Sequence, residues 1–264
     1  MPFTVAHTVL IIPIKWLWPR YVSLTGLMAG AMAPDLVYFL QLTTVSRGLG
    51  HSWTGLVMFC LPAGIAFAFA FHWLFKYNFI INLPSPFDKA LSGLATTSFS
   101  VVGLRSWAVL VVSVLVGTLS HFFWDSLTHT GGEIARAVPF LSDNTIIIGV
   151  PVLNTLIVQQ VSTTVGIVGL VFGLRKTRLL PSPQPGFAPR RTRNKLFFRV
   201  LLGAAAATFA LMVVSIFSYF LLDYPVKRAA IFGISGWSGF FYPIAVYTIR
   251  QMVRSRAAIL PNSR

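Results

Sequence analysis

The sequence predicts an all-α protein, specifically a polytopic helical membrane protein with about six to seven transmembrane helices. Two observations predict this class. The chain of 264 residues is 55% hydrophobic and only 10% charged. Apolar stretches of roughly twenty residues, the length that crosses a bilayer as a helix, also recur along the whole chain. A single cysteine, Cys60, excludes an intramolecular disulfide and argues against a thiolate metal site.

The predicted spans follow from length, because each helix needs roughly twenty residues at a rise of about 1.5 Å per residue. Six segments meet this requirement: 22–42, 52–75, 106–126, 151–174, 200–222 and 229–249. A seventh, 5–18, is short enough to be a short span, a re-entrant piece or an interfacial helix. Residues 77–105 contain prolines, glycines and serines, and we interpret them as a loop with room for one membrane-surface helix at about 91–104.

A basic segment divides the chain. Residues 175–199 carry eight Lys and Arg, four prolines and no acid, a composition typical of a flexible linker. The sequence therefore predicts three parts. Residues 1–174 form a membrane bundle, 175–199 a cytoplasmic linker, and 200–264 a two-helix membrane hairpin with a basic tail.

The distribution of basic residues predicts the orientation, because short cytoplasmic loops collect Lys and Arg. With the linker inside, nine further basic residues fall on the same side: Lys15, Arg20, Lys76, Lys89, Arg105, Arg250, Arg254, Arg256 and Arg264. These nine and the linker's eight make seventeen inside, against four outside: Arg47, Arg136, Lys227 and Arg228. We expect a cytoplasmic C-terminus, and the net charge of +15 needs no nucleic acid as a partner.

The same topology gathers scarce ionisable side chains at one membrane face. Segments 22–42 and 106–126 run outward, and 52–75 runs inward between them. Five residues then lie at the outer level: Asp35, His51, His121, Asp125 and His129. If the N-terminal segment also crosses, His7 joins them, whereas His72 lies at the cytoplasmic end.

Helical spacing supports a shared site. His121 and Asp125 share a face, since residues four apart on a helix are offset by only about 40°. His129 shares that face if the helix continues, although Gly131 and Gly132 in "HTGG" predict that it ends there. Imidazole nitrogens and carboxylate oxygens are the ligands of Zn²⁺ and similar divalent ions. Because carboxylates at membrane depth are costly unless paired or metal-bound, the pattern predicts a metal site.

Structural interpretations compete with this one. Asp35 follows Pro34 and could cap a helix, and His72 beside Trp73 is interpreted as a packing residue. Three polar residues of the fourth span could line the site, but we interpret them as interhelical hydrogen-bonding residues: Asn154, Gln159 and Gln160. Three aromatic residues are interpreted as interfacial anchors: Tyr38, Trp53 and Trp124. These interpretations do not explain why four of the five histidines and two of the six acids converge on one side.

Four ordered motifs carry a resemblance. MPFTxxH, APD, HS and SHxxWDxxTH resemble an uncharacterised bacterial family of integral membrane proteins, over residues 1 to about 175. That family is similar to inner-membrane metal-dependent hydrolases and, more remotely, to zinc-dependent phospholipases C. The resemblance implies a multi-pass protein of the bacterial inner (plasma) membrane. It also implies one or two ions, most simply zinc: one held by Asp35, His51, His121 and Asp125, and a second by His7 and His129, with Asp125 bridging.

A bound ion would make hydrolysis the simplest chemistry, since it activates water and stabilises charge on a phosphoryl or carbonyl oxygen. Asp35 and Glu133 are the candidate general bases. No Gly-x-Ser-x-Gly elbow, P-loop or dinucleotide fingerprint is present, which argues against a serine hydrolase or a nucleotide-driven pump. A site at the outer headgroup level favours membrane lipids as partners and a lipid phosphoester or polyprenyl phosphate as the substrate. The alternative is a non-enzymatic ion or lipid transporter, or a scaffold with a structural metal or polar site; the lack of an internal repeat argues modestly against transport.

Overall fold

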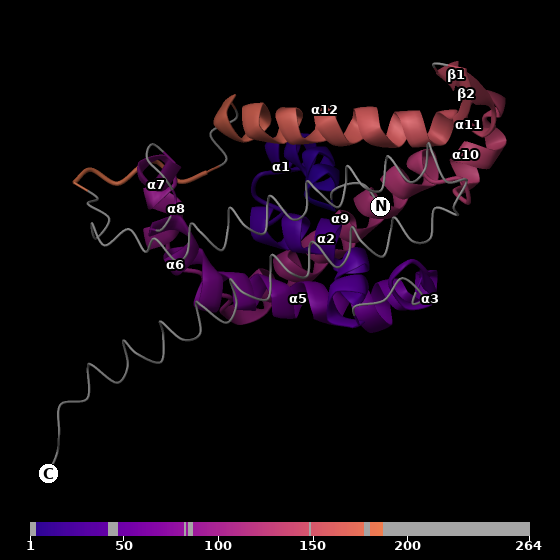
Figure 1. The fold of residues 1–264 in the computed structure, drawn as a ribbon. Helices are drawn as coiled ribbons and strands as arrows, with labels where there is room; N and C mark the ends of the chain where they lie inside the picture. The colour runs from indigo at the N-terminus through magenta and orange to yellow at the C-terminus, as the bar shows by residue number, and fades with distance from the viewer. Residues whose placement is uncertain are drawn as a thin grey trace, which may run out of the picture. The chain divides into compact units, whose positions relative to one another are not determined.

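The structure, a computed structural model, describes six stretches of the chain: residues 4–41, 47–81, 83, 87–147, 149–176 and 180–186. These residues are mostly helical, as the sequence predicts (Figure 1). The predicted spans 200–222 and 229–249 lie outside the described residues, as does most of the predicted linker. The count of six to seven transmembrane helices therefore stays a prediction.

The chain divides into two compact units. The first comprises Met1–Gln41, Val45–Ala68 and Ser100–Leu179, and the second Leu42–Thr44, Phe69–Phe99 and Leu180–Arg264. The first begins with the 3-10 helix η1 (Thr4–Leu10), followed by α1 (Ile11–Leu17), α2 (Leu24–Gln41), α3 (Arg47–Gly50), α4 (Trp53–Gly55), η2 (Leu56–Cys60) and most of α5 (Leu61–Ala70). It continues with α9 (Gly103–Thr128), α10 (Glu133–Ala137), α11 (Pro139–Ser142), β1 (Asn144–Ile147), β2 (Val150–Leu153) and α12 (Asn154–Lys176).

Helices α2 and α9 run in parallel along one another. The carbonyl of Leu27 lies against Gly117, and the carbonyl of Ala31, four residues further on, lies 2.8 Å from the ring nitrogen Nδ1 of His121. Ala31 lies one turn after Leu27 on α2, and His121 lies one turn after Gly117 on α9, so the two helices run in the same direction. This is the relative direction that the predicted topology requires for segments 22–42 and 106–126.

Small residues allow this close approach. Gly26 and Gly30 form a GxxxG spacing on α2, opposite Ser113 and Gly117 on α9. A Cβ atom on Gly30 would lie 2.0 Å from the carbonyl oxygen of Val114, which no side chain could tolerate. Small residues at fourfold spacing are typical of closely packed transmembrane helices, because they let the backbones come into contact.

The N-terminal segment runs antiparallel to α2. Its Thr4 hydroxyl donates to Asp35, and its Lys15 amine donates to the carbonyl of Val22, so its two ends match opposite ends of α2. Ile11, which is fully buried, belongs to the hydrophobic core of the first unit. Thr4–Leu17 extends roughly 25 Å as one 3-10 and one α-helical stretch. Whether this segment is a short span, a re-entrant piece or an interfacial helix stays a prediction.

Helix α12 packs on the N-terminal segment. Gly166 lies against Ala6, and Gly173 lies against the side chain of Ile12, so both segments run in the same direction. This helix begins at Asn154, not at 151 as predicted, because Val150–Leu153 forms the strand β2.

A β-hairpin that the sequence analysis did not predict stands at the start of α12 (Figure 1). Strands β1 and β2 pair antiparallel, with Thr145 opposite Val152, and Gly149 takes a positive φ of 78° in the turn. Asn154 holds the hairpin in place, since its amide donates to the carbonyl of Phe140 and accepts from the hydroxyl of Thr145. The bond to Phe140 joins α12 to α11, so the predicted interhelical hydrogen bonding of Asn154 is confirmed.

The second unit contains four short helical elements in its described residues: η3 (Phe71–Phe75), α6 (Lys76–Ile81), α7 (Phe87–Ala90) and α8 (Ser92–Thr96). Helix α8 is shorter than the predicted surface helix at 91–104. The His72 ring stacks on Phe99 at 4.1 Å between centroids, which agrees with its interpretation as a packing residue. Lys76 donates to the carbonyl of Thr97, and burial lowers the pKa of this amine from its ordinary value.

Two helices in the described residues are long and apolar enough to cross a membrane. They are the helical stretches Trp53–Phe75, which joins α4, η2, α5 and η3, and Gly103–Ala137, which joins α9 and α10 across residues 129–132. Shorter apolar helices occupy Thr4–Leu17 and Leu24–Val37. Length and composition therefore support membrane association, and the orientation of the chain in a membrane stays a prediction.

Candidate metal centre

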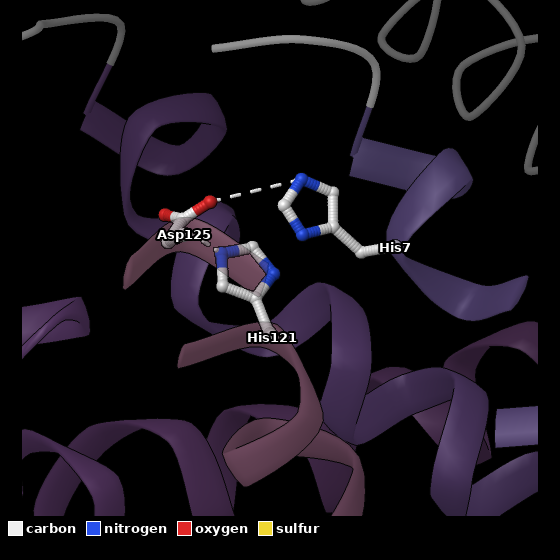
Figure 2. Close-up of side chains that lie close together, drawn as sticks. All are labelled: His7, His121 and Asp125. Carbon is white, nitrogen blue, oxygen red and sulfur yellow. Dashed lines mark ion pairs between the residues drawn. The ribbon is translucent and has the colours of Figure 1, made fainter. Parts of the chain in front are cut away.

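The structure brings together all six predicted metal ligands in the first unit. They come from separate elements: His7 from η1, Asp35 from α2, His51 from the loop before α4, His121 and Asp125 from α9, and His129 from the residue that follows α9. Two overlapping triplets have ligand atoms within 4.8 Å of one another and could hold a metal ion: His7, His121 and Asp125, and Asp35, His51 and His121. Figure 2 shows the first triplet, with the three side chains turned toward one another.

Asp125 lies at the centre of this cluster. Its Oδ2 atom is 3.2 Å from Nε2 of His51 and 3.4 Å from Nε2 of His121. Its Oδ1 atom is 3.3 Å from Nδ1 of His129 and 3.8 Å from Nε2 of His7. Each oxygen of the carboxylate thus faces a different pair of imidazoles.

Asp35 closes one side of the cluster. Its Oδ1 atom is 3.6 Å from Nε2 of His51 and 3.8 Å from Nε2 of His121. Its Oδ2 atom accepts a 2.6 Å hydrogen bond from the hydroxyl of Thr4, which leaves Oδ1 directed at the imidazoles. Asp35 and the preceding Pro34 both lie inside α2, so the alternative interpretation of Asp35 as a helix cap was wrong.

The orientation of the His121 ring is fixed by α2. Its Nδ1 atom lies 2.8 Å from the carbonyl oxygen of Ala31, and a carbonyl only accepts, so Nδ1 carries a proton. In the neutral ring, the lone pair then lies on Nε2 and points at the two carboxylates. Within the described residues, Nε2 of His121 and the Oδ1 atoms of Asp35 and Asp125 are buried with no hydrogen-bond partner. Nε2 of His121 and Oδ1 of Asp35 face one another at 3.8 Å. Two buried acceptors in this arrangement are unfavourable, and a cation between them would satisfy both.

The spacing of the ligand atoms fits a shared ion. The nitrogen–oxygen distances run from 3.2 to 3.8 Å, longer than the roughly 2.7–2.9 Å of a charge-assisted hydrogen bond. Two ligand atoms that each lie about 2.0–2.1 Å from a zinc ion at a tetrahedral angle are about 3.3 Å apart. The shorter of these distances are those expected between two ligands of one ion, so His and Asp groups in the cluster could hold a metal ion.

The cluster has a closed side and an open side. Asp35, His7 and His121 are at most 2% exposed. Asp125, His51 and His129 are 17–23% exposed. A small molecule could therefore reach the second group of side chains but not the first.

The chain between α9 and α10 borders the open side. The amide of Gly132 donates to the carbonyl of His129 at 2.8 Å, and α9 ends at Thr128, so the predicted helix stop at "HTGG" is confirmed. Glu133 begins α10 and is exposed, and its side chain makes no hydrogen bond or ion pair with the other described residues. Its role as a general base stays a prediction.

Several residues at the site were not predicted there. Thr4 and Ala31 orient Asp35 and His121, and the only sequence signal was the position of Thr4 in the MPFTxxH motif. Trp124 was predicted to be an interfacial anchor, but its ring centroid lies 5.9 Å from that of His7. Trp53 is 75% exposed, and its role as an interfacial anchor stays a prediction; the side chain of Tyr38 lies outside the described part of the chain.

The chain belongs to the family described as Domain of unknown function (DUF4184), whose match covers residues 1–252. All six clustered side chains fall within the matched residues. No curated protein and no solved structure is similar to the chain. The resemblance to metal-dependent hydrolases and to phospholipases C therefore stays a prediction.

Proposed function

We propose that this chain is a multi-pass membrane protein that holds one or two divalent metal ions, most simply zinc, and hydrolyses a lipid phosphoester at the extracytoplasmic face. One observation carries the proposal: the two oxygens of Asp125 lie within 3.8 Å of nitrogens from four histidines. Mixed nitrogen and carboxylate ligands suit zinc and neighbouring divalent transition metals.

The carboxylate of Asp125 suggests how two ions would divide the ligands. One ion would take His51, His121, Asp35 Oδ1 and Asp125 Oδ2, and the other His7, His129 and Asp125 Oδ1. Structural zinc sites usually have four protein ligands, whereas catalytic sites have three and an open position. The second set is therefore the candidate catalytic one.

A divalent ion supplies Lewis acidity, which activates water and stabilises charge on a phosphoryl oxygen. The remaining chemistry falls to the chain. Asp35 is buried on the closed side and is oriented by Thr4 as a ligand, which argues against its use as a general base. Glu133 is exposed beyond the open side and remains the candidate base, provided that α10 or the substrate brings it close.

The depth of the cluster favours a lipid substrate. Asp125 lies 22 residues after the start of α9 at Gly103, or roughly 33 Å along a helix. The hydrocarbon core of a bilayer is about 30 Å thick, so the cluster would lie near the headgroups at one face. The distribution of basic residues predicts that this is the outer face. A lipid phosphoester or polyprenyl phosphate would present its phosphate at that level.

A structural polar site is the second candidate function, and the closed side of the cluster favours it. Three of the six side chains are at most 2% exposed. A proton on both nitrogens of His121 would let it pair with Asp35 and Asp125 without an ion. The cluster would then only fasten η1, α2 and α9 together, as in a scaffold protein.

The test is metal content measured together with lipid phosphoester hydrolysis. We expect the purified wild-type chain to contain one or two equivalents of zinc by elemental analysis and to release phosphate from at least one of a panel of lipid phosphoesters. Asp125→Asn removes the bridging charge and should abolish both properties. Asp143→Asn, the same substitution at an exposed site, should abolish neither.

Two results would favour the structural site instead. One is a metal-free wild-type protein whose Asp125→Asn variant unfolds at a lower temperature. The other is a fully metal-loaded protein that hydrolyses no member of the panel.

A further inference from the structure

Helix α12 contributes a buried amide to the edge of the cluster. The Nε2 atom of Gln159 lies 3.3 Å from Nε2 of His129, and Gln159 is only 6% exposed. The other ring nitrogen of His129, Nδ1, lies 3.3 Å from Oδ1 of Asp125. The ring of His129 is thus held between a carboxylate at the cluster and an amide from a separate helix.

The hydrogen-bonding capacities of these groups fix where the proton lies. An amide NH₂ group only donates, so in this arrangement Nε2 of His129 accepts from Gln159 and the ring proton lies on Nδ1, facing Asp125. The nearby hydroxyl of Thr128 donates to the carbonyl of Trp124, so it can only accept from Nδ1. This tautomer suits a site without an ion.

Metal ligation requires the opposite tautomer. If Nδ1 of His129 is to bind a cation, its proton must leave, and the ring proton must lie on Nε2. A half-turn of the Gln159 amide would place Oε1 where Nε2 now lies, and Oε1 accepts from that proton. An amide can serve both tautomers, whereas a carboxylate serves only the second and a hydrocarbon serves neither.

We propose that Gln159 is a positioning residue of the metal centre, whose amide holds the His129 ring with Nδ1 directed at the ion. The inference rests on the proposed function only in that it requires an ion at His129. In this proposal α12 is part of the site, and Gln159 acts through His129, one of the three ligands in the set of His7, His129 and Asp125. Loss of the partner of a metal-bound histidine typically weakens metal affinity by about 10- to 100-fold.

The experiment compares three variants of the full chain in detergent: Gln159→Leu, Gln159→Glu and Gln160→Leu. The leucine is close to glutamine in size and offers no acceptor, whereas the glutamate retains one. Gln160 is the next residue and is exposed, so its leucine variant controls for a change of hydrophobicity in α12. Zinc affinity is measured by competition with a chelator, and the thermal unfolding of the metal-free proteins is measured in parallel.

We expect Gln159→Leu to weaken binding of the more loosely held zinc by about 10- to 100-fold. Gln159→Glu and Gln160→Leu should bind zinc like the wild type. Metal-free Gln159→Leu loses the buried hydrogen bond to His129 and should unfold at a lower temperature than the wild type, so zinc affinity is the deciding measurement. The recovery with glutamate is the result that a purely structural role of Gln159 would not give.

Two results would overturn the inference alone, while wild-type zinc binding still supports the proposed function. Either Gln159→Leu binds zinc as tightly as the wild type, or Gln159→Glu loses affinity as much as Gln159→Leu does. A wild-type chain that binds no zinc at all would overturn both proposals.

Discussion

Thr4 is the residue that decides which oxygen of Asp35 faces the cluster. Its hydroxyl donates to Oδ2 at 2.6 Å, and both side chains are buried. Such a bond is invisible in the sequence, because it joins residues 31 positions apart through the packing of η1 on α2. The ligand types themselves could be predicted, since depth and fourfold spacing depend only on helical geometry.

Replacement of Thr4 should therefore disturb the site without touching a proposed ligand. Thr4→Val keeps the shape of the side chain but removes the donor, so it leaves a buried carboxylate oxygen unpaired. We expect a loss of about 1–3 kcal/mol in stability and weaker zinc binding. Thr4→Ser retains the hydroxyl and should behave like the wild type. Equal thermal unfolding and equal zinc affinity of the valine and serine variants would contradict this role for Thr4.

The two candidate general bases, Glu133 and Asp35, show what could not be predicted from single residues. Glu133 follows His129 by four positions, a spacing that would place both on one helical face. Because α9 ends at Thr128 and α10 begins at Glu133, no single helix contains the pair. Asp35 was predicted as both ligand and base; it is buried, and both roles stay predictions.

At the scale of the elements, the parallel α2–α9 pair carries the site. It supplies Asp35, His121 and Asp125, and the close approach of its backbones brings the carbonyl of Ala31 to the His121 ring. The positions of both helices could be predicted from their apolar length. Their contact face could not, because all sides of these helices are apolar and only the glycines mark the interface.

Glycine at position 30 should therefore be required for the site as well as for the fold. In Gly30→Ala, the new methyl would meet the Val114 carbonyl at 2.0 Å, and the backbones of α2 and α9 would have to separate. We expect a loss of about 1–3 kcal/mol or more, together with a lower zinc content. Gly48→Ala is the matched control, since a methyl there would meet no atom within 4 Å. Thermal unfolding and elemental analysis measure the two effects, and a Gly30→Ala protein with full zinc content would contradict the coupling.

The β-hairpin shows why some elements escaped prediction. Residues 144–153 read as a short apolar run that continues into α12, and hydrophobic periodicity cannot separate a short apolar strand from the start of a helix. The local signals were Gly149, which takes a positive φ, and Pro151, which cannot donate within a helix. The side chain of Asn154 then fastens the strand pair to α11, a contact that depends on tertiary structure.

At the scale of the whole molecule, the antiparallel and parallel relations of the described helices agree with the predicted order of spans. Thr4–Leu17 runs opposite to α2, α9 runs with α2, and α12 runs with Thr4–Leu17. These relations put His7 at the level of Asp35 and His121, as expected for a crossing N-terminal segment. They fix relative directions only, so the side of the membrane must come from the basic residues.

The membrane face at which the cluster lies can be tested by cysteine labelling. In a Cys60→Ser background, single cysteines at Arg47 and Glu133 should react with a membrane-impermeant thiol reagent in intact cells, whereas a cysteine at Arg191 should react only after the cells are made permeable. The reason is the distribution of Lys and Arg, seventeen on the predicted inner side against four on the outer. Glu133 is exposed four residues after the proposed ligand His129, so its labelling also reports the side from which the open face of the cluster is reached. The reverse pattern would move the cluster to the cytoplasmic face, and the lipid substrates would then have to be those of the inner leaflet.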